Sequence, residues 1–504
     1  MPKPKATTDL RAQESTFDLF GGLQNESGLR PVAENREPNR RGGPPNRMND
    51  LTYRDWMKFQ KSFFRFVDWP THINEFISFF TKQTWEDGRL STSLLVGFDV
   101  PHSASLGRRQ IVSRPGGNSV VIGKQMAKLS HERAKYDFIF VDLRTLETGL
   151  DTDQFLRVSD AWFDSLRSLL LPGRYCGIAV NWPAKNSALP IPWMVAIAGR
   201  SRLRLRDEKI GLDADGKSQH YCLFFQADGD SIHPSRWLSD QTNLSPAKVH
   251  LPVWVMPKSP PRKADEVLHP AKFPEALVEE FVELFSSPGD TIFDPMAGTG
   301  SALLAAVKSQ RNAIGIELNP TFLEIARKRV ITNIPRLLNF VPEVELFQGD
   351  AREAEHFIPV AKVNYCITSP PYWSMLGNIG SENQQARREK NLPTVYSQSV
   401  EDLGNIHDYD EFVETLSEIY KKLASCILPG GHLTVIVKNV KRNHTVYPLA
   451  WDLVRKLAAM RSGAYTFIGN TLWCQDDVSI KPFAVGIYWV SNTLHHYCLH
   501  FRKR

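Results

Sequence analysis

Four residues in the second half of the chain have the types and positions that could bind a nucleoside. Gly298 and Gly300 lie in the turn "DPMAGTG", residues 294–300, where a residue without a Cβ lets the backbone approach a ligand. Glu317 ends an apolar run and could accept hydrogen bonds from both hydroxyls of a ribose, and Asp350 could accept one from an adenine amino group. A pyrophosphate-binding nucleotide domain is the alternative, but the turn has neither the G-x-G-x-x-G spacing nor the Lys-Ser/Thr of a P-loop.

The segment "ITSPPYWSM", residues 367–375, places two consecutive prolines and two aromatic rings after a short apolar run. Because proline has no N–H to donate to a sheet ladder, the strand predicted over Val363 to Thr368 must end there. A turn that only terminates the strand is the simplest interpretation. The alternative is a stiff, donor-free elbow with a functional role, and the rest of the chain favours it.

The elements that must position these residues are strands that alternate with helices. The segment "HPAKFPEALVEEFVELF" predicts a helix that starts near Pro274, and Asn319 and Pro320 are well placed as the cap and first turn of another. Between and after them come the apolar runs "TIF", "NAIGIE", "VELFQ" and "VNYCIT". This alternation predicts an α/β fold, with a doubly wound, mostly parallel sheet and helices on both faces. Ligands bind such sheets at the carboxyl ends of the strands, where both sets of residues fall.

At these motifs the chain resembles the amino-methyltransferases that modify exocyclic nitrogens of DNA bases. "FDPMAGTG" resembles their S-adenosylmethionine loop, "GIELNP" their acidic strand end, and "SPPY" their catalytic loop, and the likeness covers residues 268–501 in one consistent order. The resemblance implies a Rossmann-like fold of the S-adenosylmethionine-dependent methyltransferase type, S-adenosyl-L-methionine as cofactor, no metal, and double-stranded DNA as partner. The cofactor-binding residues that it implies are Phe273, Phe293, Asp294, Ala297, Gly298, Gly300, Glu317 and Asp350.

The resemblance assigns catalysis to Ser369, Pro370, Pro371 and Tyr372, and simple chemistry explains why. An exocyclic amine is a poor nucleophile because its lone pair is delocalised into the ring. If the Ser369 side-chain oxygen and the Pro370 carbonyl accept its two hydrogens, the nitrogen can pyramidalise and attack a methyl group. The two prolines hold that carbonyl rigidly, and Tyr372 offers a stacking face to a base swung out of the duplex.

A serine at the first position of this loop favours N4 of cytosine in this family, whereas aspartate or asparagine favours N6 of adenine. We therefore expect a site-specific DNA methyltransferase that acts on N4 of cytosine. The alternatives are, in order, an N6-adenine DNA methyltransferase, an RNA or protein amide methyltransferase, and a catalytically silent nucleic-acid-binding scaffold. No cysteine follows a proline, so the Pro-Cys nucleophile of ring-carbon cytosine methyltransferases is absent.

An internal repeat indicates two related halves. Residues 155–180 align without a gap on 412–437, and "HYCLFF" at 220–225 echoes "HYCLHF" at 496–501. The first copy has "YDFIFVDLRT" where the second has "NYCITSPPY", so we expect a degenerate, catalytically silent half-sheet that serves as a pseudo-dimer partner or a recognition surface. The predicted organisation is a disordered tail (1–50), an aromatic-rich helical region (51–135), the degenerate half-copy (136–250), a proline-rich linker (251–267) and the catalytic domain (268–504).

Two basic segments are candidates for nucleic-acid binding. "GRSRLRLRDEK", residues 199–209, would place four arginines on one face of a strand, which suits a phosphate backbone, although a solvated edge strand explains them equally well. The polar stretch after the catalytic loop could contact DNA, close as a lid, or be a mobile insertion. The candidate residues are Arg200, Arg202, Arg204, Arg206, Arg387, Arg388 and Lys390.

Bulk properties are those of an ordinary globular protein. The 504 residues exceed one usual domain, and the net charge of +6 permits a polyanionic partner without requiring one. The six cysteines form no C-x-x-C pair, so neither a zinc ribbon nor a disulfide framework is indicated. The start lacks the apolar core of a signal peptide, and no run approaches a membrane span, so we expect a soluble, cytoplasmic protein.

Overall fold

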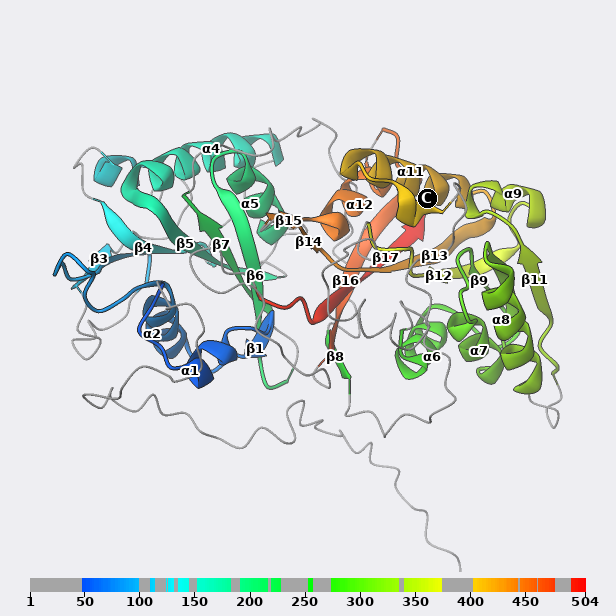
Figure 1. Cartoon of the computed structure of the whole chain (residues 1–504). Helices are drawn as coiled ribbons and strands as arrows, with labels where there is room; N and C mark the ends of the chain where they lie inside the picture. The colour runs from blue at the N-terminus through cyan, green and yellow to red at the C-terminus, as the bar shows by residue number, and fades with distance from the viewer. Residues whose placement is uncertain are drawn as a thin grey trace, which may run out of the picture.

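The computed structural model consists of two lobes that lie side by side, each built on one sheet (Figure 1). The structure describes residues 48–98, 109–113, 124, 126–130, 135–144, 152–182, 191–215, 219–227, 253–256, 273–334, 340–373, 402–442, 445–459, 461–475 and 491–504. The predicted disordered tail lies outside these ranges except at its end. There Met48 and Asn49 are both 2% exposed, so the packed structure begins before residue 50, earlier than predicted.

The second lobe, residues 253–504, carries most of the predicted site residues. Its elements are β8 (Val253–Met256), α6 (Glu275–Phe285), β9 (Thr291–Asp294), α7 (Ser301–Lys308), β10 (Asn312–Glu317), α8 (Pro320–Thr332), β11 (Val344–Gln348), η2 (Ala351–Glu353), α9 (Ala354–Phe357), β12 (Val363–Thr368), η3 (Leu403–Asn405), α11 (Tyr409–Leu423), β13 (Ile427–Val437), β14 (Val440–Arg442), β15 (Thr445–Tyr447), α12 (Leu449–Leu457), β16 (Tyr465–Gln475) and β17 (His495–Lys503). Eight strands form one sheet in the order β11-β10-β9-β12-β13-β17-β16-β8. Only β17 runs antiparallel to its neighbours.

Helices cover both faces of this sheet (Figure 1). α6, α7 and α8 lie on one face, and α9, α11 and α12 lie on the other. The predicted doubly wound, mostly parallel α/β sheet is therefore confirmed. The local signals act as expected: Asn319 caps α8 by accepting from the N–H of Thr321 at 2.9 Å, and Pro320 is its first residue.

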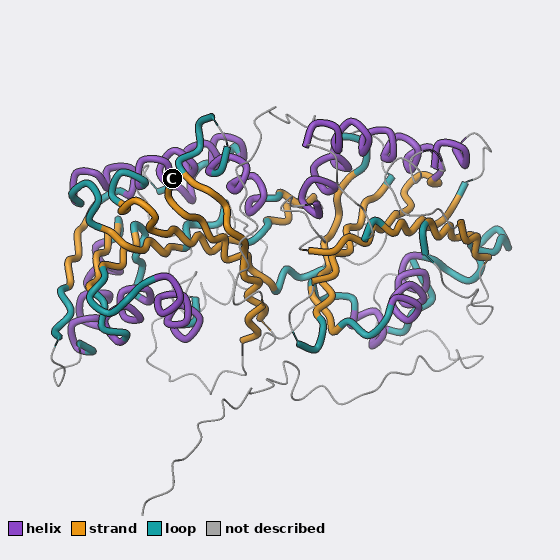
Figure 2. Tube along the Cα trace, turned by 180° about the vertical axis from the view of Figure 1, so that it is seen from behind, coloured by secondary structure: helices purple, strands orange, loops and turns teal. Residues whose placement is uncertain are grey.

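The first lobe, residues 48–227, contains a second sheet. Its elements are α1 (Tyr53–Lys58), β1 (Phe63–Arg65), α2 (Trp69–Phe80), β2 (Thr92–Val96), β3 (Arg109–Ser113), β4 (Tyr136–Asp142), α4 (Thr152–Leu169), β5 (Leu170–Trp182), α5 (Ile191–Arg200), β6 (Arg204–Leu212) and β7 (Gln219–Gln226). Seven strands pair in the order β1-β6-β7-β5-β4-β2-β3, and only β7 is antiparallel to its neighbours. Figure 2 shows both sheets from behind, with helices on either side of each.

The two sheets have the same strand order. Read from their edge strands, β1-β6-β7-β5-β4-β2-β3 corresponds to β8-β16-β17-β13-β12-β9-β10, and the first sheet lacks only a counterpart of β11 among the described residues. β6 and β16 even share a bulge at the same place, between Leu205 and Asp207 in one and between Phe467 and Gly469 in the other. The first copy is therefore a nearly complete sheet, and the predicted half-sheet is wrong.

Two predicted boundaries also need correction. The region 51–135, predicted as helical, contributes β1, β2 and β3 to the first sheet, because short runs such as "TSLLV" pair with strands far along the chain. The predicted linker 251–267 contains β8, which pairs with β16. Pro252 and Pro257 bracket this strand, so the prolines mark its ends. In the part of the chain that the structure describes, no helix is both long and apolar enough to cross a membrane.

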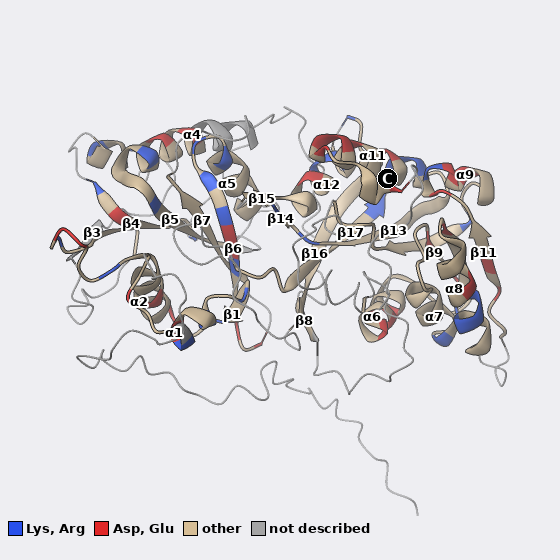
Figure 3. Ribbon diagram, viewed as in Figure 1, with Lys and Arg blue, Asp and Glu red and all other residues tan. Residues whose placement is uncertain are grey.

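The lobes contact each other through a buried polar network around Glu208, which lies on β6 and is 1% exposed. Tyr497 donates its hydroxyl to one carboxylate oxygen at 3.0 Å, and Asn439 donates its amide to the other at 2.9 Å. His495 Nε2 lies 3.2 Å from the same oxygen that accepts from Asn439. A carboxylate of the first lobe thus fixes three side chains of the second, and Figure 3 shows the charged β6 facing that lobe.

Corresponding elements meet at this interface. α5 and α12 follow the corresponding strands β5 and β13, and Trp193 of one stacks on Trp451 of the other with ring centroids 6.1 Å apart. Lys441 forms an ion pair with Asp207, which is fully buried. Such pairs are costly to break because one charge would remain buried alone. The interface therefore behaves as part of the core of the molecule.

Candidate active site

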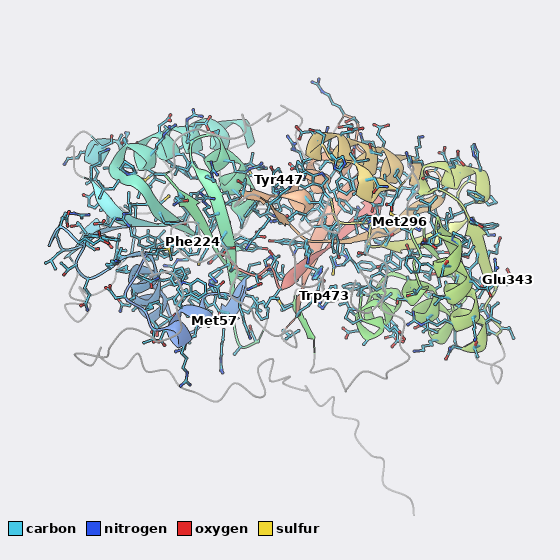
Figure 4. The ribbon with its side chains drawn as sticks, viewed as in Figure 1. Met57, Phe224, Met296, Glu343, Tyr447 and Trp473 are labelled. Atoms are coloured by element: carbon cyan, nitrogen blue, oxygen red, sulfur yellow. The ribbon has the colours of Figure 1, made fainter. Side chains whose placement is uncertain are left out.

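Four predicted ligand-binding residues lie at the carboxyl edge of the second sheet. Asp294 ends β9 and Glu317 ends β10, whereas Asp350 follows β11 and Ser369 follows β12. These four strands are neighbours and parallel, so their ends meet at one edge. Met296, labelled in Figure 4, lies in the turn that follows β9.

The glycine turn is shaped by two residues with left-handed backbone, Gly298 (φ 52°) and Gly300 (φ 78°). Gly300 is also the N-cap of α7, and a Cβ there would lie 3.0 Å from the Cβ of Ala326 and 3.2 Å from a methyl of Val330. A side chain at position 300 would therefore collide with α8. The absence of a Cβ at Gly300 makes room for α8 and not for a ligand. This position needs glycine so that the turn can pack closely against α8.

Glu317 holds the turn and keeps acceptor capacity. One of its oxygens accepts from the N–H of Gly298 at 2.7 Å, and the other accepts from the N–H of Asn319 at 2.8 Å. Burial raises the pKa of Glu317, although these two hydrogen bonds oppose that rise. Each carboxylate oxygen has a further lone pair, so the side chain fits the two hydroxyls of a ribose.

Two aspartates flank Glu317. Asp350 is partly committed, because it accepts from the N–H of Arg352 at 2.8 Å and pairs with the Arg352 guanidinium at 3.0 Å. Asp294 is fully buried and accepts from the N–H of Met296 at 3.0 Å, and the Thr368 hydroxyl interacts with its carboxyl group. Burial raises the pKa of Asp294 to about 7.

The apolar candidates differ in their surroundings. Phe273 and Ala297 are 7% and 4% exposed and belong to one hydrophobic cluster on the α6 side of the sheet. Phe293 is fully buried in the cluster on the opposite face. This packing leaves the Phe293 ring no surface for a cofactor, so its predicted contact is not supported.

The elbow after β12 consists of Ser369, Pro370, Pro371 and Tyr372. Ser369 is 9% exposed, and its hydroxyl lies 3.3 Å from that of Tyr372. Pro370 is buried and Pro371 half-buried, and neither has an N–H to compete for an acceptor. Burial raises the pKa of Tyr372, so its phenol is neutral.

Trp373 anchors this elbow, a role that the sequence did not reveal. Its indole N–H donates to the carbonyl of His407 at 3.2 Å. Its ring packs against Tyr447 and Tyr409 with centroids 4.7 and 5.2 Å away, and the Arg442 guanidinium lies 4.9 Å from the ring. Figure 4 shows Tyr447 in the middle of the molecule, between the lobes. The elbow is therefore clamped from the side of the lobe interface.

The predicted arginine face on residues 199–209 is not observed. Arg200 is the last residue of α5, whereas Arg204 begins β6, so the arginines do not share one strand. β6 bulges at Arg206, which is fully buried and donates to Gln226 at 2.6 Å. Arg206 is therefore closed to a phosphate, and Arg202 is already in an ion pair at 2.6 Å with a carboxylate of α4. The other basic candidates, Arg387, Arg388 and Lys390, lie outside the described residues.

No group of three or more His, Cys, Asp or Glu side chains within the described ranges could hold a metal ion. The arrangement at the sheet edge instead combines the Glu317 carboxylate, the buried carboxyl group of Asp294 and a close glycine turn. This set of groups fits a nucleoside cofactor. The elbow that follows β12 contains a hydroxyl and a proline carbonyl, which are groups that could accept hydrogen bonds from an amino group.

Several characterised DNA methyltransferases are similar to the chain. Type II methyltransferase M.ScaI of Streptomyces caespitosus is 23% identical over 36% of this chain and 69% of its own length. The orphan methyltransferase M.BamHII of Bacillus amyloliquefaciens is 26% identical over the same shares. The DNA adenine methyltransferase YhdJ of Escherichia coli is 34% identical, but only over 16% of this chain and 26% of its own.

Solved structures show more distant likenesses. A SAM-dependent methyltransferase from Methanosarcina mazei is 11% identical, covering 47% of this chain and 99% of that one, with a TM-score of 0.27. TrmN from Thermus thermophilus is 12% identical, covering 77% and 80% respectively, with a TM-score of 0.29.

The family described as DNA methylase matches residues 45–328, more than half of the chain. The match begins in the first lobe, so that lobe belongs to the family region as well. It continues through the glycine turn and Glu317 and ends in α8, before the elbow. The predicted resemblance is confirmed, and the chain belongs to the DNA methylase family.

Proposed function

We propose that the chain is a site-specific DNA methyltransferase that transfers a methyl group to an exocyclic amino group, with N4 of cytosine as the target. The observation that carries this proposal is the Ser369-Pro370-Pro371-Tyr372 elbow, which directly follows β12 beside the nucleoside-binding strand ends. Family membership and the names of its relatives support DNA as the substrate.

S-adenosylmethionine is the cofactor, and it supplies an electrophilic methyl group. Glu317 takes the ribose hydroxyls, and Asp350 takes the adenine amino group with the capacity that Arg352 leaves free. Phe273 and Ala297 line the apolar side of the cofactor, and the Gly298 N–H holds the Glu317 carboxylate in place. The chain's own contribution is thus to orient the donor toward the end of β12.

The elbow activates the target amine by holding its two hydrogens so that the nitrogen lone pair is withdrawn from conjugation with the ring. The Ser369 hydroxyl oxygen and the Pro370 carbonyl accept the two N–H bonds, so the nitrogen lone pair is free to point at the methyl group. The base must leave the duplex to reach them, and Tyr372 supplies a face on which it stacks. The transfer would be direct: the methyl C–S bond of the donor breaks as the N–C bond forms, the donor leaves as a neutral thioether, and the nitrogen then loses one proton to solvent.

The resemblance to the DNA amino-methyltransferases implies cytosine, because a serine at the position of Ser369 favours N4 of cytosine in that family. N6 of adenine is the second candidate target, and the likeness to YhdJ, which is named as a DNA adenine methyltransferase, favours it. The relatives named as type II methyltransferases support a role in restriction and modification.

The first lobe is catalytically silent in this proposal. Counted by sheet register from the shared His-Tyr-Cys of β7 and β17, Asp142 takes the place of Ser369. Its carboxylate is held by the Arg144 guanidinium, with contacts at 2.8 and 2.6 Å, so it is not available to an amine. The lobe serves as an intrachain pseudo-dimer partner and as part of the DNA-recognition surface.

The test is long-read sequencing that detects modified bases in DNA from a host expressing the protein. We expect N4-methylcytosine at one short sequence, and its absence when Ser369→Ala is expressed instead. N6-methyladenine at a short sequence would transfer the proposal to adenine, and unmodified DNA would refute it.

A further inference from the structure

Two polar side chains, Lys438 and His496, lie next to Tyr372, and a third, Trp473, packs against His496. Lys438 directly follows β13, and its ammonium lies over the Tyr372 ring, 5.5 Å from the centroid. The His496 ring, on β17, is 5.9 Å from the Tyr372 ring. His496 in turn stacks on Trp473 of β16 with centroids 4.1 Å apart. The proposed reaction uses none of the three.

Two of these three side chains, His496 and Trp473, are buried and each has a nitrogen without a hydrogen-bond partner, whereas Lys438 is half-buried. His496 and Trp473 are 4% and 3% exposed, and neither His496 Nδ1 nor the Trp473 indole nitrogen has a hydrogen-bond partner. Burial lowers the pKa of Lys438 to about 8, and no acidic group opposes that shift. Burial and the nearby charge of Lys438 also lower the pKa of His496, so its imidazole is neutral. An unsatisfied buried donor costs about 1–3 kcal/mol, and a bound ligand with acceptors would remove this cost.

The silent lobe provides an internal comparison. His220 occupies the register position of His496, since both pair in the same way with the strands beside them. Unlike His496, it is fully partnered: its Nδ1 lies 2.9 Å from Asn181 Oδ1 and its Nε2 lies 3.1 Å from Asp213 Oδ1. The unpartnered state therefore belongs to the lobe that carries the elbow, and not to this position of the fold.

We propose that Lys438, assisted by His496 and Trp473, reads the ring acceptors of the target base and selects cytosine. This inference rests on the proposed function and deepens it. An ammonium, an indole N–H and one tautomer of a neutral imidazole are all donors. Cytosine presents two adjacent acceptors, N3 and O2, beside its amino group, whereas adenine presents N1 and then a C–H. A base that packs on Tyr372 would lie next to the Lys438 ammonium, which is 5.5 Å from the centre of that ring.

The carboxylate of the cofactor is the competing partner for these donors. Trp473 shares a hydrophobic cluster with Phe273 and Ala297, so the cofactor side is not far away. The cofactor carboxylate and the target base can be distinguished by experiment. A carboxylate contact would appear in cofactor affinity, whereas a base contact would appear in turnover and in discrimination between bases.

The test compares Lys438→Met with Lys328→Met, which changes an exposed lysine of α8. The substrates are duplexes of the methylated sequence with cytosine or 3-deazacytosine at the target position, the latter lacking the N3 acceptor. With cytosine, Lys438→Met should lower kcat/KM about 10- to 100-fold and leave S-adenosylmethionine affinity unchanged. Lys328→Met should change neither. The analogue should slow the wild-type enzyme by a similar factor and slow Lys438→Met little further, because both changes remove one contact.

Several results would overturn the inference. If the losses of kcat/KM caused by Lys438→Met and by 3-deazacytosine add up, or if Lys438→Met turns over normally, Lys438 does not contact the base. A matching loss of cofactor affinity would assign it to the carboxylate. If Lys438→Met does not fold, His496→Phe replaces it, because it keeps the ring stack and should lower kcat/KM. The comparison of cytosine with 3-deazacytosine on the wild-type enzyme needs no variant at all. A wild-type enzyme that methylates no DNA would refute the proposed function and this inference with it, whereas an active wild type with an indifferent Lys438→Met refutes only the inference.

Discussion

The glycine turn allows a matched pair of substitutions, Gly300→Ala and Gly430→Ala. Both glycines lie in the second lobe with nearly the same left-handed backbone, φ 78° and φ 77°. They differ in their surroundings. A Cβ at Gly430 would meet nothing within 4 Å, whereas a Cβ at Gly300 would lie 3.0 Å from Ala326 Cβ and 3.2 Å from a Val330 methyl.

The magnitude follows from these two features. The left-handed backbone costs any residue with a Cβ about 1–2 kcal/mol, and this cost applies to both variants. Only Gly300→Ala must also push the turn away from α8, and overpacking of this kind costs about 1–3 kcal/mol more. The free energy of unfolding of the lobe should therefore fall by about 1–2 kcal/mol for Gly430→Ala and by about 2–5 kcal/mol for Gly300→Ala.

Urea unfolding followed by circular dichroism measures this difference, and calorimetric titration with S-adenosylmethionine measures the functional consequence. Displacing the turn should disturb the bond between the Gly298 N–H and Glu317, so cofactor affinity should fall in Gly300→Ala but not in Gly430→Ala. Gly300→Asp, which adds an anion, should abolish binding. Equal stability of the two alanine variants would refute the claim that α8 imposes the glycine.

Three further predictions concern single side chains. Ser369→Ala should reduce turnover by about 3 kcal/mol of transition-state stabilisation, with cofactor and DNA affinities kept; single-turnover kinetics with normal rates would contradict its role. Burial raises the pKa of Asp294 from 3.8 to about 7, so the folded state keeps a proton that the unfolded state loses. The stability of Asp294→Asn relative to wild type should therefore increase by roughly 4 kcal/mol as pH rises from about 4 to about 7, and urea midpoints with a constant difference would contradict this. Glu208→Ala leaves the Tyr497 hydroxyl and His495 without their acceptor, so thermal melting should show destabilisation of about 3–5 kcal/mol, whereas an unchanged Tm would mean that the interface is not needed for stability.

The second lobe could be predicted because its signals are local. Prolines, glycines and caps mark where each strand ends, and Asn319 before Pro320 fixes a helix start within one residue. The ends of parallel strands then fall at one edge by topology alone. The sequence therefore placed Glu317 and Ser369 near each other without any knowledge of side-chain contacts.

The first lobe could not be predicted in the same way, because its pairings are non-local. β1 has only three residues and pairs with β6, far along the chain. The arginines occur at every second position up to Arg206, which predicts that they share one face of a strand. The bulge in β6 at Arg206 breaks this alternation of faces and turns the side chain into the core. No local pattern signals such a bulge.

The side chains around Tyr372 show a third case. Lys438 and His496 are brought together by the antiparallel pairing of β13 with β17, which sequence spacing does not reveal. The repeated His-Tyr-Cys was a signal that this position recurs in both copies. It did not show that one histidine would be partnered and the other left without a hydrogen bond to Nδ1.

The central claim is that the elbow after β12 presents a cytosine amino group to a methyl donor. Its most direct test is methylation of DNA by the purified protein with S-adenosylmethionine that carries a deuterated methyl group, followed by mass spectrometry of the released nucleosides. The account predicts the label in N4-methyldeoxycytidine with the wild-type protein and a strongly reduced signal with Ser369→Ala. Label in another nucleoside, or in none, would contradict it.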